Sequence, residues 1–219
     1  MIKALIFDFD GLILDTESPT YYSWQEIYQE YGCSLPLSKW AECIGSAETF
    51  DPHDYLEAQL GRSLDRVALR NKRRSRCTEL IAIESIRPGV ENYIFEAKTL
   101  DLKLGVASSS PRSWVDGHLS RLNLEVHFDA IKCADDVPCV KPDPGLFQAT
   151  LKALEVAADE AIVLEDSLNG VLAAKRASIF CVAVPNPLMQ GFSYDLADLR
   201  LSFLAELSLE ELLGKAGET

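Results

Sequence analysis

Two pairs of acidic side chains in this sequence could hold a divalent cation or transfer protons. The first pair lies at the end of the apolar segment 3–9 and is followed by a glycine that lets the chain turn; the second pair follows the apolar segment 161–164. These residues are Asp8, Asp10, Gly11, Glu165 and Asp166. Carboxylates gathered in one place repel each other unless a cation binds, and hard oxygen ligands favour Mg²⁺ over zinc. Together the pairs predict a magnesium site, whereas either pair alone could simply solvate a loop.

Hydroxyl and amine groups that could bind a phosphate lie between the two acidic pairs. Ser108 and Ser109 end the apolar segment 103–108 where a helix is expected to start, and backbone N–H groups at such a start favour anions. Serines before a proline are also common helix caps. Lys141 stands before Pro142 and would neutralise a transferring group if it faces an acidic site; otherwise it is a solvated loop charge.

Short apolar segments alternate with amphipathic stretches, and this rhythm predicts the elements that position these residues. Five segments show no polar alternation, so they are expected as strands buried on both faces. They are 3–9, 103–108, 130–133, 161–164 and 180–184. Helical spacing separates most of them, as in Phe147, Leu151 and Leu154. The alternation predicts a doubly wound α/β fold with a mostly parallel sheet, which binds ligands beyond the carboxyl ends of its strands.

Residues 16–85 interrupt this rhythm with helical patterns and no strand. A first helix is expected to begin at a Ser18 cap and to end at Gly32, and further helices are expected over 52–60 and 63–83. A helical insertion is the simplest explanation. We therefore expect a core domain of residues 1–15 and 86–219 and a helical cap domain of residues 16–85, with hinges near 14–15 and 85–88.

Composition limits the partners of the protein. Its 219 residues carry a formal net charge of -13, and binding to nucleic acid or to an anionic membrane without sequence preference needs a basic surface, so neither partner is expected. No apolar run approaches the roughly 20 residues of a membrane span. The six cysteines form no CxxC pair, which is typical of reduced thiols, so we expect a cytoplasmic protein.

Four motifs in this order resemble the haloacid dehalogenase superfamily, in its β-phosphoglucomutase-like phosphatase branch. They are DFDG at 8–11, SSS at 108–110, KP at 141–142 and EDS at 165–167, and the helical insertion matches the cap of that family. The resemblance covers nearly the whole chain and implies a Rossmann-like core. An acid at position 10 also matches the phosphatases rather than the dehalogenases, because a halide leaves without a proton.

The resemblance implies a role for each matching residue. Asp8 would be the nucleophile on phosphorus, and Asp10 would protonate the leaving alcohol and then activate water. Ser108, the Ser109 N–H and Lys141 would hold the phosphoryl oxygens. Mg²⁺ would be held by Asp8, the Asp10 carbonyl, Glu165 and Asp166, directly or through water.

Substrate contacts are also expected from residues near these motifs. They are Gly11, Thr16, Ser46, Glu48, Arg112 and either Arg73 or Arg74. Trp40 and Trp114 are interpreted as packing groups, and the three histidines are assigned no role.

Two activities fit the motifs. A phosphosugar mutase must bind a second phosphate, yet no Lys or Arg lies between Lys39 and Arg62, and Thr20 stands where mutases have a histidine. The prediction is therefore an Mg²⁺-dependent phosphohydrolase acting on a small phosphorylated metabolite, a sugar or polyol phosphate, as a monomer or weak homodimer. A β-phosphoglucomutase-type mutase is the alternative, and a catalytically idle binding protein is a third.

Overall fold

A six-stranded parallel sheet lies at the centre of the computed structural model, which describes residues 1–40 and 50–217. The strand order is β3-β2-β1-β4-β5-β6, and neighbouring strands all pair in parallel. The strands are β1 Ala4–Phe7, β2 Lys103–Ala107, β3 Ala130–Lys132, β4 Ala161–Glu165, β5 Phe180–Ala183 and β6 Leu199–Arg200. Phe7 pairs with Val106 on one side and Leu164 on the other, so the central strands end at one level. The predicted doubly wound α/β fold is confirmed, and the described sheet is parallel throughout.

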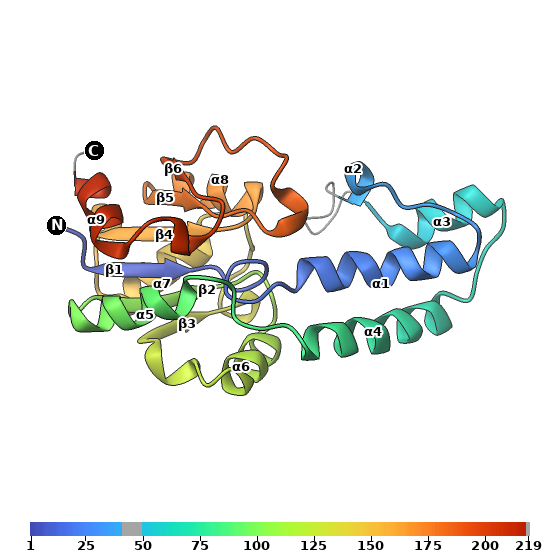
Figure 1. The fold of residues 1–219 in the computed structure, drawn as a ribbon, viewed down its shortest axis with the longest axis horizontal. Helices are drawn as coiled ribbons and strands as arrows, with labels where there is room; N and C mark the ends of the chain where they lie inside the picture. The colour runs from blue at the N-terminus through green and yellow to red at the C-terminus, as the bar shows by residue number, and fades with distance from the viewer. Residues whose placement is uncertain (41–49, 218–219) are drawn as a thin grey trace.

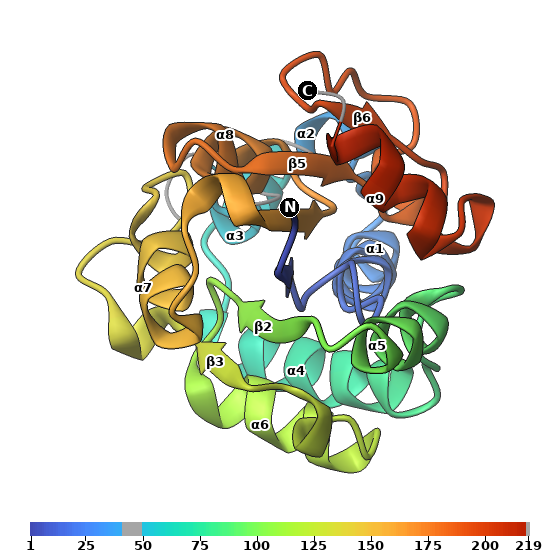
Figure 2. The same cartoon turned by 90° about the vertical axis from the view of Figure 1, so that its left-hand side faces the viewer.

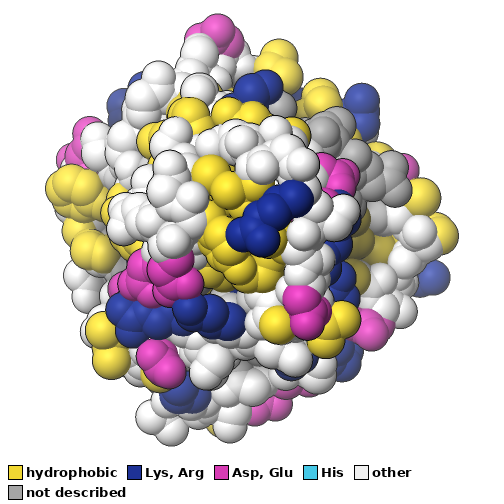
Figure 3. Space-filling view, turned by 90° about the vertical axis from the view of Figure 1, so that its right-hand side faces the viewer, with side chains coloured by type: hydrophobic (Ala, Val, Ile, Leu, Met, Phe, Trp, Pro, Cys, Tyr) yellow, Lys and Arg dark blue, Asp and Glu magenta, His cyan; other side chains and the backbone are white. Residues whose placement is uncertain are grey.

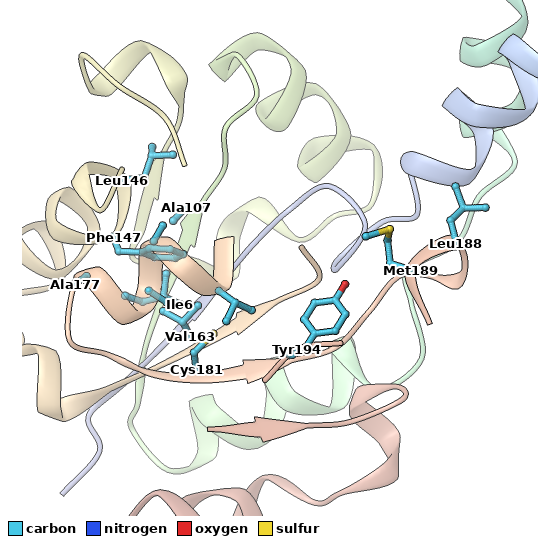
Figure 4. Packing of buried hydrophobic residues seen from close by; sticks show 14 of the residues in the cluster. Ile6, Ala107, Leu146, Phe147, Val163, Ala177, Cys181, Leu188, Met189 and Tyr194 are labelled. Atoms are coloured by element: carbon cyan, nitrogen blue, oxygen red, sulfur yellow. The ribbon is translucent and has the colours of Figure 1, made fainter. Parts of the chain in front are cut away.

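Helices cover both faces of the sheet and form two apolar cores with it. Ala4 and Ile6 of β1 belong to the core under α7 and α8, whereas Leu5 and Phe7 belong to the core under α5, α6 and α9. The helices are α5 Val90–Thr99, α6 Arg112–Arg121, α7 Gly145–Leu154, α8 Leu168–Arg176 and α9 Leu209–Gly217. Figure 2 shows α7 and α8 on one side of the strands and α5 and α9 on the other. In the first core Phe147 lies close to Ile6 (Figure 4). Burial on both faces explains why the strand segments lack polar alternation.

The chain crosses between the sheet and the helices of residues 16–85 in two segments that lie side by side. The first turns after β1, where Gly11 adopts a φ of +83° and its N–H donates to the Leu14 carbonyl at 2.7 Å. The second runs back along it: Leu14 and Ile86 form an antiparallel bridge, and Arg87 N–H donates to the Ile13 carbonyl at 2.9 Å. These crossings include the two predicted hinges, whose motion stays a prediction.

The described helices between these crossings extend beyond the carboxyl ends of the strands (Figure 1). They are α1 Glu17–Glu30, α2 Leu37–Trp40, α3 Pro52–Leu60 and α4 Arg66–Ala82. α1 and α4 pack along each other, and ion pairs of Arg76 with Glu26 at 2.8 Å and of Lys72 with Glu30 at 2.5 Å link them. Acidic and basic side chains also lie next to one another on the surface of this end of the molecule (Figure 3). The division into core and cap domains stays a prediction.

Two predicted helix starts in this region are wrong. α1 begins at Glu17 and not after a Ser18 cap, because the Asp15 carboxylate accepts a hydrogen bond from Ser18 N–H at 2.9 Å and the helix starts earlier. α4 begins three residues later than predicted, since the Asp65 carboxylate caps its first turn. α3 covers the predicted range 52–60.

The described helices are short or rich in charge. The longest, α4, has 17 residues and carries several arginines. Among the described helices, none combines the length with the apolar composition that a bilayer span requires.

Candidate active site

The ends of β1 and β4 bring three predicted acids together with Lys141 in one buried cluster. Asp8 follows β1, Glu165 ends β4 and Asp166 comes next. Lys141 Nζ donates to Asp8 Oδ1 at 2.5 Å and also to Glu165 Oε1. All four side chains are buried. Residues separated by more than 130 positions thus meet where neighbouring parallel strands end.

The three acids of this cluster could hold a divalent cation. Asp8, Glu165 and Asp166 each offer a carboxylate oxygen, and the three oxygens lie within 4.8 Å of one another. Three negative charges against the one positive charge of Lys141 leave an excess that a divalent cation would neutralise. A set of oxygen ligands alone suits Mg²⁺. The residues present therefore fit the predicted ion.

Close packing and hydrogen bonds fix the side chains of Glu165 and Asp166. A Cβ atom on Gly11 would lie 1.9 Å from Asp166 Oδ2, so only glycine leaves room for that carboxylate. Asn186 Nδ2 donates to Asp166 Oδ2 at 2.7 Å. The N–H and hydroxyl of Ser167 each donate to Glu165 Oε2 at 3.0 Å. Gly11, predicted at the phosphate site, thus supports the acid cluster; its contact with phosphate stays a prediction.

Burial controls the protonation of the cluster. It raises the pKa of the Asp8 carboxyl well above its usual range; Lys141 opposes this effect and the nearby carboxylates add to it. Burial and the charge of Glu165 likewise raise the pKa of Asp166. Burial lowers the pKa of Lys141, but its two carboxylate partners outweigh burial and raise it above the usual value. Lys141 therefore stays charged, and a bound cation would favour ionisation of both Asp8 and Asp166.

Glu17 brings a further acid to this region from the first turn of α1. Burial, followed by the charges of Asp10, Asp15 and Asp8, raises the pKa of Glu17 to about 8. The residue directly precedes the buried Ser18 and follows Thr16. No role was predicted for Glu17, because nothing in its sequence neighbourhood shows that it faces three other acids.

Asp10 lies beside the buried cluster in a different environment. Its Oδ1 accepts hydrogen bonds from Thr16 Oγ1 at 2.8 Å and from Trp114 Nε1 at 2.9 Å. Its Oδ2 accepts from Ser110 Oγ at 2.6 Å and from Ser108 Oγ at 3.2 Å. The Asp10 carboxylate is not one of the three that gather for a cation. Its predicted metal contact through the backbone carbonyl stays a prediction.

The loop after β2 carries the predicted serines to Asp10. Ser108 is buried, and its Oγ accepts a hydrogen bond from Ser110 N–H at 3.0 Å, whereas Ser109 is exposed. Backbone bonds from Ser108 N–H to Lys132 and from Ala134 N–H to Ser110 fix the loop beside β3. Ser108 and Ser109 therefore lie where a phosphate next to Asp10 could reach them; their contact with it stays a prediction.

Arg112, a predicted substrate residue, forms hydrogen bonds with residues at the end of β3 and in the turn that follows. Its Nη2 donates to Asp136 Oδ2 at 2.6 Å and to the Ile131 carbonyl at 2.9 Å, and its backbone N–H donates to Asp135 at 2.6 Å. These contacts hold the first turn of α6 against the end of β3. The structure thus gives Arg112 an anchoring role, and a substrate contact for it stays a prediction.

The structure describes some, but not all, of the predicted substrate residues in the helical region. Thr16 contacts Asp10, as described above. Arg73 lies over the ring of Trp24, with 5.7 Å between the guanidinium carbon and the ring centre. Arg74 is exposed. Ser46 and Glu48 lie outside the described residues.

Three further residues of the site were missed or misinterpreted from the sequence. Trp114 is more than the packing group it was interpreted as, because its indole N–H reaches Asp10. Arg87 donates to the carbonyls of Gly11, Val184 and Pro185 and so ties the second crossing to the loops after β1 and β5. Asn186 holds Asp166. Of these three, only Arg87 lies in a segment that the sequence predicted, the hinge near 85–88, and that prediction gives no sign of these contacts.

Comparison with known proteins places this site in a family. Residues 5–184 match the family of haloacid dehalogenase-like hydrolases. Over 213 residues the chain is 49% identical to YhcW of Bacillus subtilis, a protein whose name proposes a phosphatase activity, and the match covers 97% of both chains. Hexitol phosphatase B of Escherichia coli K12 is 29% identical over 216 residues, again with 97% of both chains covered.

Solved structures share the fold over its full length. β-Phosphoglucomutase from Clostridium difficile superposes with a TM-score of 0.76 at 25% identity, covering 100% of this chain and 98% of that one. The predicted resemblance to the β-phosphoglucomutase-like branch is therefore confirmed.

Proposed function

This chain belongs to the haloacid dehalogenase-like hydrolases and is a phosphatase, and we propose that it cleaves a small sugar or polyol phosphate with Mg²⁺ through a phosphoaspartyl intermediate on Asp8. The observation that carries the proposal is the position of Lys141, which contacts Asp8 within a cluster of buried carboxylates. A carboxylate can attack a phosphate dianion only if the charges on both are masked, and this cluster supplies the means.

In the first step, an Asp8 carboxylate oxygen attacks phosphorus. A bond forms between this oxygen and phosphorus as the bond from phosphorus to the alcohol oxygen breaks. Asp10 donates its proton to the departing alcohol oxygen. Lys141, the Ser108 hydroxyl and the Ser109 N–H stabilise the negative charge on the phosphoryl oxygens.

In the second step, water attacks the phosphorus of the phosphorylated Asp8. Asp10, now a carboxylate, accepts the proton of that water, and the bond between phosphorus and the Asp8 oxygen breaks. Inorganic phosphate leaves, and both aspartates return to their starting states. The same carboxyl group therefore serves as acid and then as base.

Mg²⁺ would be held by Asp8, Glu165 and Asp166, with the Asp10 carbonyl as a further ligand. When bound, it supplies charge neutralisation for the nucleophile and the phosphoryl group. Asn186 and Ser167 hold two of the ligands in place.

Similarity to hexitol phosphatase B supports the choice of a sugar or polyol phosphate as substrate. Similarity to a β-phosphoglucomutase keeps a mutase as the second candidate. The Thr20 hydroxyl, at the position where mutases have a histidine, donates to the Thr16 carbonyl at 2.7 Å within α1, which favours the hydrolase.

Phosphate release from a panel of sugar and polyol phosphates tests the proposal. We expect Mg²⁺-dependent release by the natural chain and a loss of about 10⁴-fold or more in Asp8→Asn, because the nucleophile is gone. Asp159→Asn, which removes an exposed carboxylate from the turn before β4, is the matched control and should keep full activity.

Two results would contradict this assignment. Phosphate release that persists in a folded Asp8→Asn variant would remove the nucleophile from the mechanism. Conversion of one hexose phosphate isomer into another, only when a hexose bisphosphate is added, would establish the mutase instead.

A further inference from the structure

We infer that Trp114 is a positioning residue for Asp10. The indole N–H of Trp114 determines which carboxylate oxygen of Asp10 carries the transferred proton. This inference rests on the proposed function, in which Asp10 is the acid and base. Trp114 is held on α6, outside the four sequence motifs. Its contact with Oδ1 of Asp10 at 2.9 Å is a direct hydrogen bond.

The four donors around Asp10 are not equivalent. Three are hydroxyls, from Thr16, Ser108 and Ser110, and a hydroxyl can either donate a hydrogen bond or rotate to accept one. The indole N–H of Trp114 can only donate. A proton on Oδ2 leaves Oδ1 as the carbonyl oxygen, which is the stronger acceptor and keeps the hydrogen bond from Trp114, while a serine hydroxyl turns to accept the proton. Trp114 therefore favours Oδ2 as the protonated oxygen.

The indole is also held more firmly than a hydroxyl. Its ring packs edge to face against His118, with 4.4 Å between ring centres, and His118 in turn stacks on Phe9, which precedes Asp10 in the chain. The Arg112 contacts described above anchor the turn of α6 from which Trp114 projects. A donor fixed by its own packing orients its acceptor, whereas a rotating hydroxyl follows it.

The consequence for the reaction is a defined donor atom. The proton leaves from Asp10 Oδ2, on the side of Ser108 and Ser110, as the bond between phosphorus and the alcohol oxygen breaks. The Ser110 hydroxyl can turn to stabilise Oδ2 before and after the transfer. Trp114 therefore acts through Asp10 and need not touch substrate.

Leaving groups of different basicity test this inference. An alkyl phosphate such as sorbitol 6-phosphate needs a proton on its leaving alcohol, whereas 2,4-dinitrophenyl phosphate does not. In Trp114→Phe we expect kcat/KM for the alkyl ester to fall about 10- to 100-fold, a part of what general acid catalysis supplies, and kcat/KM for the aryl ester to change less than about threefold. kcat/KM is chosen because it reports only the steps up to the phosphorylation of Asp8.

Two controls separate the possible causes. Tyr93→Phe removes a hydrogen bond to the Leu207 carbonyl that involves none of the residues around Asp10, and it should leave the ratio of the two kcat/KM values unchanged. If Trp114→Phe does not fold, a benzothienylalanine at position 114 keeps the ring shape without the N–H and should give the same change in the ratio.

The outcomes are distinct. Equal loss for both esters, or no loss for either, would overturn the positioning role while leaving the proposed function intact. If the natural chain hydrolyses neither ester, or if Asp8→Asn hydrolyses both, the proposed function fails and this inference fails with it.

Discussion

Asp8 and Asp10 are two residues apart in the chain, yet their carboxylates lie in opposite kinds of environment. Asp8 is buried among charges: Lys141 contacts it, and Glu165 and Asp166 lie within 4.8 Å. Asp10 is surrounded by neutral donors, namely three hydroxyls and the indole of Trp114.

This difference shows how one loop can carry two kinds of chemistry. Gly11, at a φ of +83°, turns the chain directly after Asp10, and Thr16 beyond this turn donates to the Asp10 carboxylate. A nucleophile needs its charge neutralised, and charged partners do this; an acid that becomes a base needs partners that accept either protonation state, and hydroxyls do this.

Removing the Asp10 carboxylate should distinguish the roles of Asp8 and Asp10 most clearly. In Asp10→Asn we expect kcat/KM for an alkyl phosphate to fall about 10²- to 10⁴-fold, the usual contribution of general acid catalysis. The loss for 2,4-dinitrophenyl phosphate should be at least tenfold smaller, because Asp8 can still attack. Steady-state kinetics on both esters measure the two losses; similar losses would mean that Asp10 serves the same function as Asp8.

Removing the charge on Lys141 should damage the fold as well as the reaction. Lys141→Met leaves the carboxylates of Asp8 and Glu165 buried without their cation, and breaking one side of a buried ion pair typically costs about 3–5 kcal/mol in the free energy of unfolding. Urea unfolding without added metal measures this loss. Mg²⁺ should restore part of it, because a divalent cation replaces the missing charge.

A surface ion pair provides the matched control. Lys175 pairs with Asp198 at 2.6 Å near the surface, and Lys175→Met should cost less than about 1 kcal/mol. Equal losses in the two variants would show that the Asp8 cluster is no more sensitive to charge than an ordinary surface pair.

Much of the charged cluster could be predicted from the sequence, because its positions follow from strand order alone. Apolar segments without polar alternation identify strands buried on both faces, and acids at the ends of two such strands must meet. β6 was missed because its two residues are too short to show a pattern. Ends of helices were misplaced by two or three residues where an acid caps them, as at Asp15 and Asp65.

The neutral environment of Asp10 could not be predicted in the same way. Trp114 reaches Asp10 across 104 positions, and its direction depends on how Arg112 holds α6 to β3. No local pattern records such a contact, and an aromatic residue at helical spacing is as consistent with packing as with a hydrogen bond. Arg87, for the same reason, is predicted only as part of the hinge near 85–88.

Glu17 offers the smallest expected effect: burial raises its pKa, and the charges of Asp10, Asp15 and Asp8 add to that effect. Its pKa is raised to about 8 in the folded chain, so folded protein holds a proton that the unfolded chain has released above the ordinary range of a glutamate near 4.5. The free energy of unfolding should therefore fall, through Glu17, as pH rises from about 4.5 to about 8. Glu17→Gln removes this contribution, so its stability should decline less steeply than that of the natural chain when urea unfolding is measured from pH 5 to pH 8. Glu91→Gln, at an exposed position of α5, should leave the slope as it was. Parallel slopes for the natural chain and Glu17→Gln would mean that neither burial nor the neighbouring acids raise the pKa of Glu17 in the folded chain.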